Sequence, residues 1–405
     1  MVFDQALRRE PSAVFVPEYD PQIQPDDGRI QALFYEGMAY HGKPTRVFAY
    51  LGVPNGAECA PVPAVVLVHG GGGHAYYEWV RRWVAKGYAA IAMDTEGYFP
   101  ADAYKGLAGG FEGEPPETYT RFDVSDAYAS IPSAAIAGAR VCEHPDTPLE
   151  DQWLYHAVSV VLMAQTVLKN DSRVQADRIG ICGISWGSVI SSIAIGQGSG
   201  FAFAVNIYGS AYLEHSLAGI MQAYHRIPSN NYQNPTATVQ KITCPVLWLC
   251  WNDDQCFSLL PNSLSYGATH GKGARLCIKN EWSHSHAHAW KAVEPYWFAD
   301  YAWGKTDYPD IVEEECSGNV RTWRLIGADP VKSVRVYYLT DPMRYSENSE
   351  MLNAWQTVEA TVDGKTVSAL LPDGANSYYL EVIVGCAAGR YTVCSEFRRL
   401  EGDWI

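Results

Sequence analysis

The chain has 405 residues, of which 47% are hydrophobic and 13% are aromatic. A chain of this length and composition can bury a large core, and the length fits two domains or one large domain with an appendage. The formal net charge of −15 disfavours nucleic acid and anionic membrane surfaces as partners, because both would repel the protein. A small neutral substrate fits this charge better.

The N-terminal stretch MVFDQALRREPSAVFVPEYDP has no basic region followed by an apolar core, so we expect no signal peptide. No apolar run is long enough to span a membrane. Ten cysteines in 405 residues are too sparse for a small disulfide-stapled fold. Cys182 and Cys250 lie in strand-like segments, where a free thiol packs as a small hydrophobic group. We therefore expect reduced cysteines in a cytoplasmic protein.

From about residue 30, strand-like and helix-like segments alternate along the chain. We expect strands at TRVFAYLGVP, PAVVLVHG, YAAIAMDTEG, RIGICGIS, FAFAVNIYG and CPVLWLCWN, and helices at YEWVRRWVAKG, EDQWLYHAVSVVLMAQTVLKN and WGSVISSIAIG. In the second helix, apolar residues recur at 3.6-residue spacing, which predicts one buried face. The alternation predicts an α/β fold with a mostly parallel central sheet and helices on both of its faces.

Two further regions depart from this alternation. Residues 95–148 are rich in Gly, Pro, Tyr and acidic residues, and they follow a strand at the end where α/β folds bind ligands, which favours a lid-like insertion over a surface loop. After about Lys305, short segments alternate apolar and polar residues, with an Asp363-Gly364 hairpin turn and no helix between them. We expect a catalytic domain at 1–304 and an antiparallel, immunoglobulin-like β-sandwich at 305–405.

Four consecutive glycines, Gly70 to Gly73, follow the strand PAVVLVHG and are flanked by His69 and His74. Glycine weakens regular structure, so such a run indicates that main-chain N–H groups must approach another group closely. A phosphate or a developing oxyanion could be that group. The run lacks the G-K-[ST] ending of a phosphate-binding loop, which argues against a nucleotide.

The segment GICGISWGSVI contains the pattern G-x-S-x-G around Ser185, at the point where a strand ends and a helix begins. Such a turn holds the serine hydroxyl clear of the sheet, and small residues two positions before and after let strand and helix pass closely. A serine nucleophile also needs a base, an acid that orients the base, and donors for the oxyanion. Asp253-Asp254 follow a later strand, and three histidines follow in NEWSHSHAHAW.

These segments together resemble the α/β-hydrolase superfamily, in its dienelactone hydrolase and acetylxylan esterase-like branch, which borders on prolyl oligopeptidase-type peptidases. The resemblance covers roughly residues 40–300 and includes the chain order Ser, Asp, His. It implies Ser185 as nucleophile and selects Asp254 over Asp253 from the G-x-x-D-like segment Trp251-Asn252-Asp253-Asp254. It also implies His286 as the base, from the H-G-x-G-W-like segment His286 to Trp290.

The remaining assignments complete the expected site. Main-chain N–H groups of Trp186 and Gly71, or less favourably Gly72, are expected to form the oxyanion hole. His74, Tyr76 and His288 are candidate substrate contacts, although His74 could instead be structural. His284, His286 and His288 alternate as metal ligands can, but no further ligand set is evident, so we expect neither a metal nor a cofactor.

The resulting hypothesis is a serine hydrolase that cleaves carboxylic esters of small acyl size, acetylated sugars being one such class, through an acyl-enzyme. A prolyl oligopeptidase-type peptidase that cleaves short peptides is the second hypothesis, and the missing N-terminal propeller argues against it. A non-catalytic carbohydrate- or partner-binding protein is the third, which the complete Ser-Asp-His set disfavours. The sequence leaves the acyl group, the alcohol and the oligomeric state open.

Overall fold

The computed structural model describes residues 2–100, 119–121, 147–216, 219–314, 316–327, 330–344, 353–386 and 389–400. The chain divides into two compact units. Unit 1 comprises Met1–Asn206 and Asn230–Cys244, and unit 2 comprises Ile207–Ser229 and Pro245–Ile405. Residues 245–304 thus cluster with the C-terminal strands, while the expected domain boundary at residue 305 stays a prediction.

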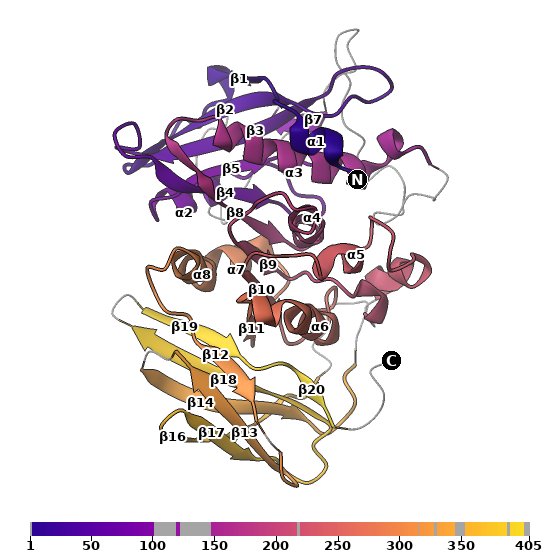
Figure 1. The fold of residues 1–405 in the computed structure, drawn as a ribbon, viewed down its shortest axis with the longest axis vertical. Helices are drawn as coiled ribbons and strands as arrows, with labels where there is room; N and C mark the ends of the chain where they lie inside the picture. Colours follow the sequence, from indigo (N-terminus) through magenta and orange to yellow (C-terminus); the bar gives the residue numbers. More distant parts are fainter. Residues whose placement is uncertain are drawn as a thin grey trace. The chain divides into compact units, whose positions relative to one another are not determined.

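A mixed β-sheet forms the core of unit 1, with its strands in the order β1-β2-β3-β5-β4-β8-β9 (Figure 1). Their bounds are β1 Ala13–Phe15, β2 Gly28–Glu36, β3 Arg46–Pro54, β4 Val62–Val68, β5 Ala89–Met93, β8 Val174–Ile184 and β9 Ala204–Ile207. β4 pairs in parallel with β5 and β8, whereas β1, β2, β3 and β5 pair antiparallel in succession. The α/β class is confirmed, and the sheet is mixed because the N-terminal strands are antiparallel.

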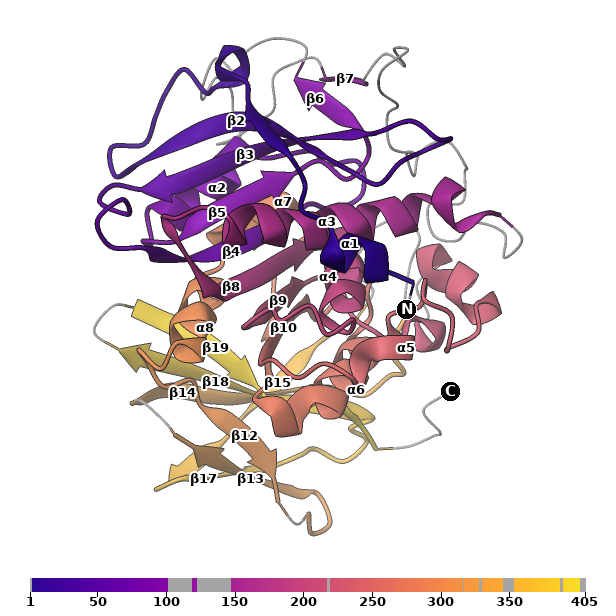
Figure 2. The ribbon, with the colours of Figure 1, turned by 45° about the horizontal axis from the view of Figure 1, so that its top comes forward.

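The helices of unit 1 are α1 Asp4–Arg8, α2 Tyr77–Val84, α3 Trp153–Lys169, α4 Trp186–Ile195 and α5 Thr236–Val239. Every residue of α3 from Trp153 to Leu168 is buried except Thr166. The expectation of a single buried face was therefore too narrow. α3 packs not only on strands β4, β5 and β8 but also against α1 and α4, and Figure 2 shows α1 beside it.

A small antiparallel pair, β6 Tyr98–Pro100 and β7 Tyr119–Arg121, follows β5. Most of the lid-like insertion expected at 95–148 lies outside the described residues. No helix within the described ranges is both long and apolar enough to cross a bilayer.

After two short 3-10 helices at Leu213–His215 and Gly219–Arg226, unit 2 contains two parallel strands, β10 Val246–Trp251 and β11 Arg275–Lys279, whose last residues pair with each other. Helix α6, Leu259–Thr269, lies between them in the sequence, and α7 His286–Lys291 and α8 Glu294–Ala302 follow. The sequence analysis did not identify α6 or β11. The loop after β10 carries Asp254, the loop after β11 carries His284, and His286 and His288 lie in α7.

The C-terminal region forms two antiparallel sheets, as expected for a β-sandwich. One has the order β12-β13-β17-β16, and the other β15-β14-β18-β19 with β20 beside β18. The bounds are β12 Asp310–Glu313, β13 Val320–Ile326, β14 Val331–Leu339, β15 Gln356–Glu359, β16 Thr361–Asp363, β17 Thr366–Leu370, β18 Ser377–Cys386, β19 Gly389–Cys394 and β20 Arg398–Arg399. Gly364, with φ 59°, lies in the expected hairpin turn, where positive φ favours glycine.

Within unit 2, the strand β19 packs on the segment from β11 to α8. The Ile278 N–H lies 3.3 Å from the Cys394 sulfur, and the Thr392 N–H donates to the buried Glu294 carboxylate at 2.9 Å. Trp297 stacks on Tyr391 with ring centroids 5.4 Å apart. The C-terminal strands therefore cover apolar and charged groups that precede residue 305.

Deletion of residues 305–405 should yield an aggregating protein. The deletion uncovers Trp297 and the surface of β11, and it removes the Thr392 N–H that donates to Glu294, which leaves Lys279 as the remaining partner of this buried carboxylate. Size-exclusion chromatography and thermal unfolding of the truncated protein test this. A monomeric truncated protein with a cooperative transition would contradict the expectation.

Candidate active site

Ser185 occupies the sharp turn between β8 and α4 in unit 1. Its backbone has φ 56° and ψ −121°, a conformation that residues with side chains rarely adopt and that costs about 1–3 kcal/mol. The residue remains partly exposed, while Ile184 and Trp186 on either side are buried. Its carbonyl accepts a hydrogen bond from the Ser188 N–H at 2.8 Å, in the first turn of α4. This is the local geometry expected of a serine held at a strand-to-helix turn.

The two glycines around Ser185 are required by close backbone contacts. A Cβ atom at Gly183 would lie 2.3 Å from the Gly187 carbonyl oxygen, and one at Gly187 would lie 2.0 Å from the Val68 carbonyl oxygen. Both distances are shorter than non-bonded contacts allow. Because α4 starts directly against the end of β4, where the glycine run begins, only glycine fits at these two positions.

The glycine run uses its N–H groups in different ways. The Gly72 N–H lies 3.3 Å from the Glu96 carboxylate, and the Gly73 N–H donates to the Gly70 carbonyl at 3.0 Å. For the Gly71 N–H, no acceptor is found among the described residues. A Cβ atom at Gly71 would lie 2.5 Å from Cδ1 of Trp186, so the backbone at Gly71 lies against the residue that follows Ser185. Of the two expected glycine donors, Gly71 is the one that remains suitable for an oxyanion.

His69 fixes the start of this loop. Its Nε2 accepts the Thr95 N–H at 3.0 Å, so the proton is on Nδ1, which donates to the Gly70 carbonyl at 2.7 Å. The buried Asp94 carboxylate lies beside it, with Oδ2 3.9 Å from His69 Nε2. Burial raises the pKa of Asp94 to about 6, against the opposing effect of His69. These groups join the ends of β4 and β5 behind the glycine run.

His74 and Tyr76, the expected substrate contacts in unit 1, lie next to each other. Their ring centroids are 3.9 Å apart, and His74 is buried whereas Tyr76 is partly exposed. Burial, together with the charge of Asp94, raises the pKa of Tyr76, so its phenol is neutral. Their role toward a substrate stays a prediction.

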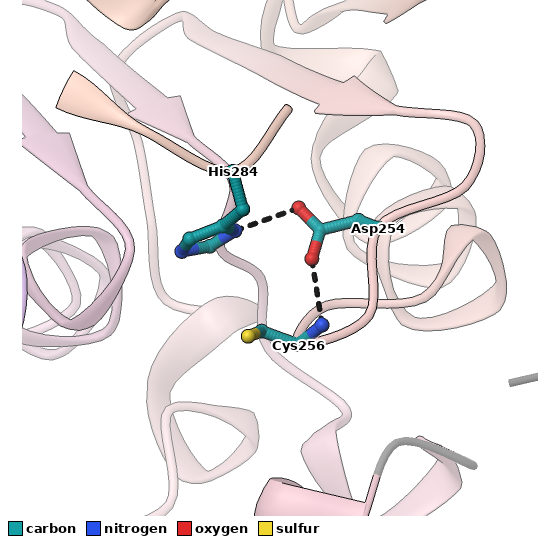
Figure 3. A group of neighbouring side chains, drawn as sticks. All are labelled: Asp254, Cys256 and His284. Carbon is teal, nitrogen blue, oxygen red and sulfur yellow. Dashed lines mark hydrogen bonds and ion pairs between the residues drawn. The ribbon is translucent and has the colours of Figure 1, made fainter. Parts of the chain in front are cut away.

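In unit 2, Asp254 pairs with His284 (Figure 3). The Asp254 Oδ2 atom lies 2.9 Å from the His284 Nδ1 atom, and Oδ1 accepts the N–H groups of Cys256 at 2.7 Å and Phe257 at 2.9 Å. The carboxylate is fully buried, whereas the His284 side chain is 23% exposed. The imidazole lies near the rings of Phe257 and Tyr208, with centroids 6.0 and 4.8 Å away. The acid is held by three donors, and one edge of the histidine remains accessible.

The pairing of Asp254 with His284 corrects the expected pairing with His286. His286 is the first residue of α7, and its ring centroid lies 6.0 Å from that of Trp290. The His288 Nδ1 atom lies 2.7 Å from the Ser283 hydroxyl and 3.2 Å from the Ser285 hydroxyl. Because the helix starts at His286, the histidine in the preceding loop is the one that reaches the acid.

Of the two adjacent acids, Asp253 has a different partner. Its carboxylate accepts a hydrogen bond from the side-chain amide of Asn353. Asp253 and Asp254 therefore have different partners, and the role expected for Asp254 stays a prediction.

The family model for dienelactone hydrolases matches residues 47–294, which is more than half of the chain. The chain belongs to the dienelactone hydrolase family. It is therefore a carboxylic-ester hydrolase of the α/β-hydrolase class, as the sequence resemblance implied. Among curated proteins, no relative of the chain was found.

Several solved structures are similar at low identity. Acetyl xylan esterase 1 from Thermoanaerobacterium sp. JW/SL YS485 is 16% identical, with a TM-score of 0.48, over 75% of this chain and 90% of that one. Glucuronoyl esterase from Solibacter usitatus is 13% identical, with a TM-score of 0.46, over 73% and 86%. Acylaminoacyl peptidase from Pyrococcus horikoshii is 16% identical, with a TM-score of 0.47, over 70% of this chain but only 42% of that one. The chain is assigned to the dienelactone hydrolase family from the family match alone, and not from these similar structures.

One group of described side chains in this dienelactone hydrolase family member could hold a metal ion. Ligand atoms of Asp254, Cys256 and His284 all lie within 4.8 Å of one another, and Figure 3 draws the three side chains. A thiolate, an imidazole and a carboxylate would suit a soft divalent cation such as zinc. Such an ion would have to replace the proton between His284 and Asp254, so it would compete with the acid–base pair.

The sequence analysis placed His284 only among three alternating histidines and preferred His286 as the base, and it missed Asp94 and Glu96 at the candidate site. A strand assignment for ARLCIKN would have placed His284 four residues beyond a strand end, and Asp254 lies three residues beyond the end of β10. Asp94 and Glu96 directly follow β5, at the same edge of the sheet as the glycine run. Polar residues just past a strand end were thus the signal available for all three.

The raised pKa of Asp94 predicts a pH-dependent loss of stability. The pKa of Asp94 in the folded protein is about 6, above the ordinary value of 3.8. Between these two pH values the carboxyl is therefore protonated in the folded protein and ionised in the unfolded chain. Stability attributable to this group therefore falls as pH rises from about 4 to about 6, by up to about 3 kcal/mol.

Asp94→Asn tests this, since it keeps the Oδ1 acceptor for the N–H groups of Glu96 and Tyr98 and removes the titration. Urea unfolding at pH 4 and pH 7 should show the variant gaining stability relative to the parent protein as pH increases. A difference that is constant with pH would contradict the expectation.

Proposed function

We propose that the chain hydrolyses carboxylic esters of small acyl groups, with Ser185 as nucleophile, His284 as general base and Asp254 as the acid that orients the base. The observation that carries the proposal is the Asp254–His284 pair, together with a strained, partly exposed serine at a strand-to-helix turn. The family supports an ester as the bond cleaved. Acetylated sugars remain one substrate class within this proposal.

The hydrogen bonds of the pair determine the proton transfers. Because His284 Nδ1 donates to Asp254, Nε2 is the ring nitrogen that takes the proton of the Ser185 hydroxyl as the serine oxygen attacks the ester carbonyl. The tetrahedral intermediate then collapses, and His284 returns that proton to the leaving alkoxide, which gives an alcohol and an acyl-Ser185. Water attacks the acyl group with His284 again as base, and the carboxylic acid and the free serine are released.

The oxyanion requires donors beside Ser185. We assign the N–H groups of Trp186 and Gly71, since Gly72 is directed to Glu96 and Gly73 to the Gly70 carbonyl. Removal of one oxyanion donor typically costs about 2.7–4 kcal/mol of transition-state stabilisation. The contact of Gly71 with the Trp186 ring supports this pairing of donors.

Ser185→Ala should abolish hydrolysis of an activated acetyl ester and labelling by a fluorophosphonate probe, while the unfolding temperature stays the same or rises. The methyl group fits where the hydroxymethyl did, and only the nucleophile is lost. Substantial turnover by the folded variant would refute the mechanism. Turnover of aminoacyl amides in preference to esters would favour the peptidase, and failure of the parent protein to react with the probe would favour the binding protein.

His284→Ala and His286→Ala form a matched pair that tests the base. We expect His284→Ala to reduce the acylation rate by roughly four to six orders of magnitude, as removal of a triad member does, and His286→Ala to act mildly through packing of α7. Burst measurements of acylation distinguish them. If His286→Ala were the inactive variant, the assignment of the base would be wrong.

The acyl pocket should accept acetate better than octanoate. The buried indole of Trp186 follows the nucleophile directly and limits the space for an acyl chain. Tyr77 and Trp79, which follow the glycine run, are core residues of α2 with 3% exposure each. The kcat values for p-nitrophenyl acetate, butyrate and octanoate should decrease in that order, and faster turnover of octanoate at saturation would exclude the small-acyl proposal.

A further inference from the structure

The loops that carry Asp254 and His284 are joined to each other before they reach these residues. The Asn252 N–H donates to the Lys279 carbonyl at 3.0 Å, which extends the pairing of β10 and β11 by one residue. The Asn252 side-chain amide then donates to Asn280 Oδ1 at 2.8 Å. Asp254 lies two residues beyond Asn252, and His284 four beyond Asn280, so this bond fixes the relative position of the two loops.

The Asn280 amide is in turn held by strand β18. The Tyr379 hydroxyl donates to Asn280 Oδ1, and Asn280 Nδ2 donates to Glu381 Oε2 at 2.8 Å. Asn280 Oδ1 therefore accepts two hydrogen bonds, from Asn252 and from Tyr379, while Nδ2 donates in the opposite direction. An amide with partners on both sides cannot rotate without breaking at least one bond.

Strand β18 provides a rigid support for this amide. Tyr379 is fully buried, and its ring stacks on Tyr337 of β14 with centroids 5.2 Å apart and an interplanar angle of 8°. The ring of Trp355 packs edge-on against it at 5.3 Å. Glu381 pairs in register with Arg335 of β14. Neither residue can shift without disturbing the sheet.

A second, independent contact links the C-terminal region to the Asp254 loop. The Asn353 side-chain amide donates to the Asp253 carboxylate and to the Arg344 carbonyl, the latter at 2.9 Å. Asn353 Oδ1 accepts the Arg344 N–H at 2.8 Å. Asp253 is adjacent to Asp254, so this bond is a second anchor of the loop directly before the acid.

We propose that Tyr379 and Glu381 are positioning residues for ester hydrolysis, which act through Asn280 to fix the geometry of the Asp254–His284 pair. This inference rests on the proposed function, and it gives the sheet of β14 and β18 a part in the reaction beyond stability. The two residues need not touch the substrate. Their effect is transmitted through one amide to both loops.

Three variants test the proposal. Tyr379→Phe removes a single hydroxyl and leaves the stacked ring, Glu381→Ala removes the acceptor of Asn280 Nδ2, and Glu381→Gln retains an acceptor oxygen. We expect the first two to lower kcat for an acetyl ester by about 10- to 100-fold with little change in KM, because a small misplacement of the pair slows the chemical step. Glu381→Gln should restore most of the activity.

A proton NMR measurement tests the positioning without ester turnover. The Nδ1 proton that His284 shares with Asp254 should give a low-field resonance, absent in His284→Ala, that shifts or broadens in Tyr379→Phe and Glu381→Ala. If the parent protein showed this resonance but hydrolysed no ester, the proposed function would fail while the positioning test remained valid.

Tyr338→Phe is the matched control, since it removes a hydroxyl whose bond to Gln356, at 2.8 Å, stays between β14 and β15. It should leave both kcat and the resonance unchanged. The proposal is overturned if folded Tyr379→Phe and Glu381→Ala retain the parent kcat and an unshifted resonance, or if Tyr338→Phe affects both equally. Should Tyr379→Phe fail to fold, the comparison of Glu381→Ala with Glu381→Gln decides alone.

Discussion

The buried carboxylate of Asp254 is the group on which the geometry of the acid–base pair depends. A charge with no exposure to water is tolerated only when its oxygens are fully hydrogen-bonded. Two main-chain N–H groups from Cys256 and Phe257 satisfy one oxygen, and His284 satisfies the other. The turn after Asp254 and the orientation of the imidazole are therefore consequences of a single desolvation requirement. The side-chain amides of Asn252 and Asn280 maintain this arrangement by joining the loops at their bases.

The parts of the site that the sequence predicted are those specified by local contacts. A Cβ atom at Gly183 would collide with the Gly187 carbonyl within the same strand–turn–helix unit, and one at Gly187 would collide with the Val68 carbonyl at the end of the neighbouring strand β4. That requirement is visible in a pentapeptide. The sequence likewise indicated the glycine run and Asp254, since each directly follows a hydrophobic strand.

The choice among the three histidines depended on information that the pattern does not contain. The Ser285 hydroxyl accepts the His288 N–H at 3.3 Å, which caps α7 and makes His286 its first residue. Serine, alanine and histidine alternate through this segment, so the position of the cap is not evident beforehand. The bond between Asn280 and Glu381 spans 101 positions of the chain, and no periodicity relates two residues so far apart. The nearly complete burial of α3 could not be predicted for the same reason. It depends on α1 and α4, which pack against faces of α3 that the apolar spacing did not mark as buried.

Glycine would fit the turn between β8 and α4 with less strain than Ser185 does. It adopts φ 56° without the steric penalty that a Cβ atom brings, and that penalty is present in every folded molecule whether or not substrate is bound. A library of variants sorted only for heat resistance would consequently enrich glycine at position 185 and lose the hydroxyl. With Ser185 as the proposed nucleophile, selection for thermostability and selection for turnover oppose each other at this codon, so laboratory evolution of this enzyme has to include a screen for ester hydrolysis.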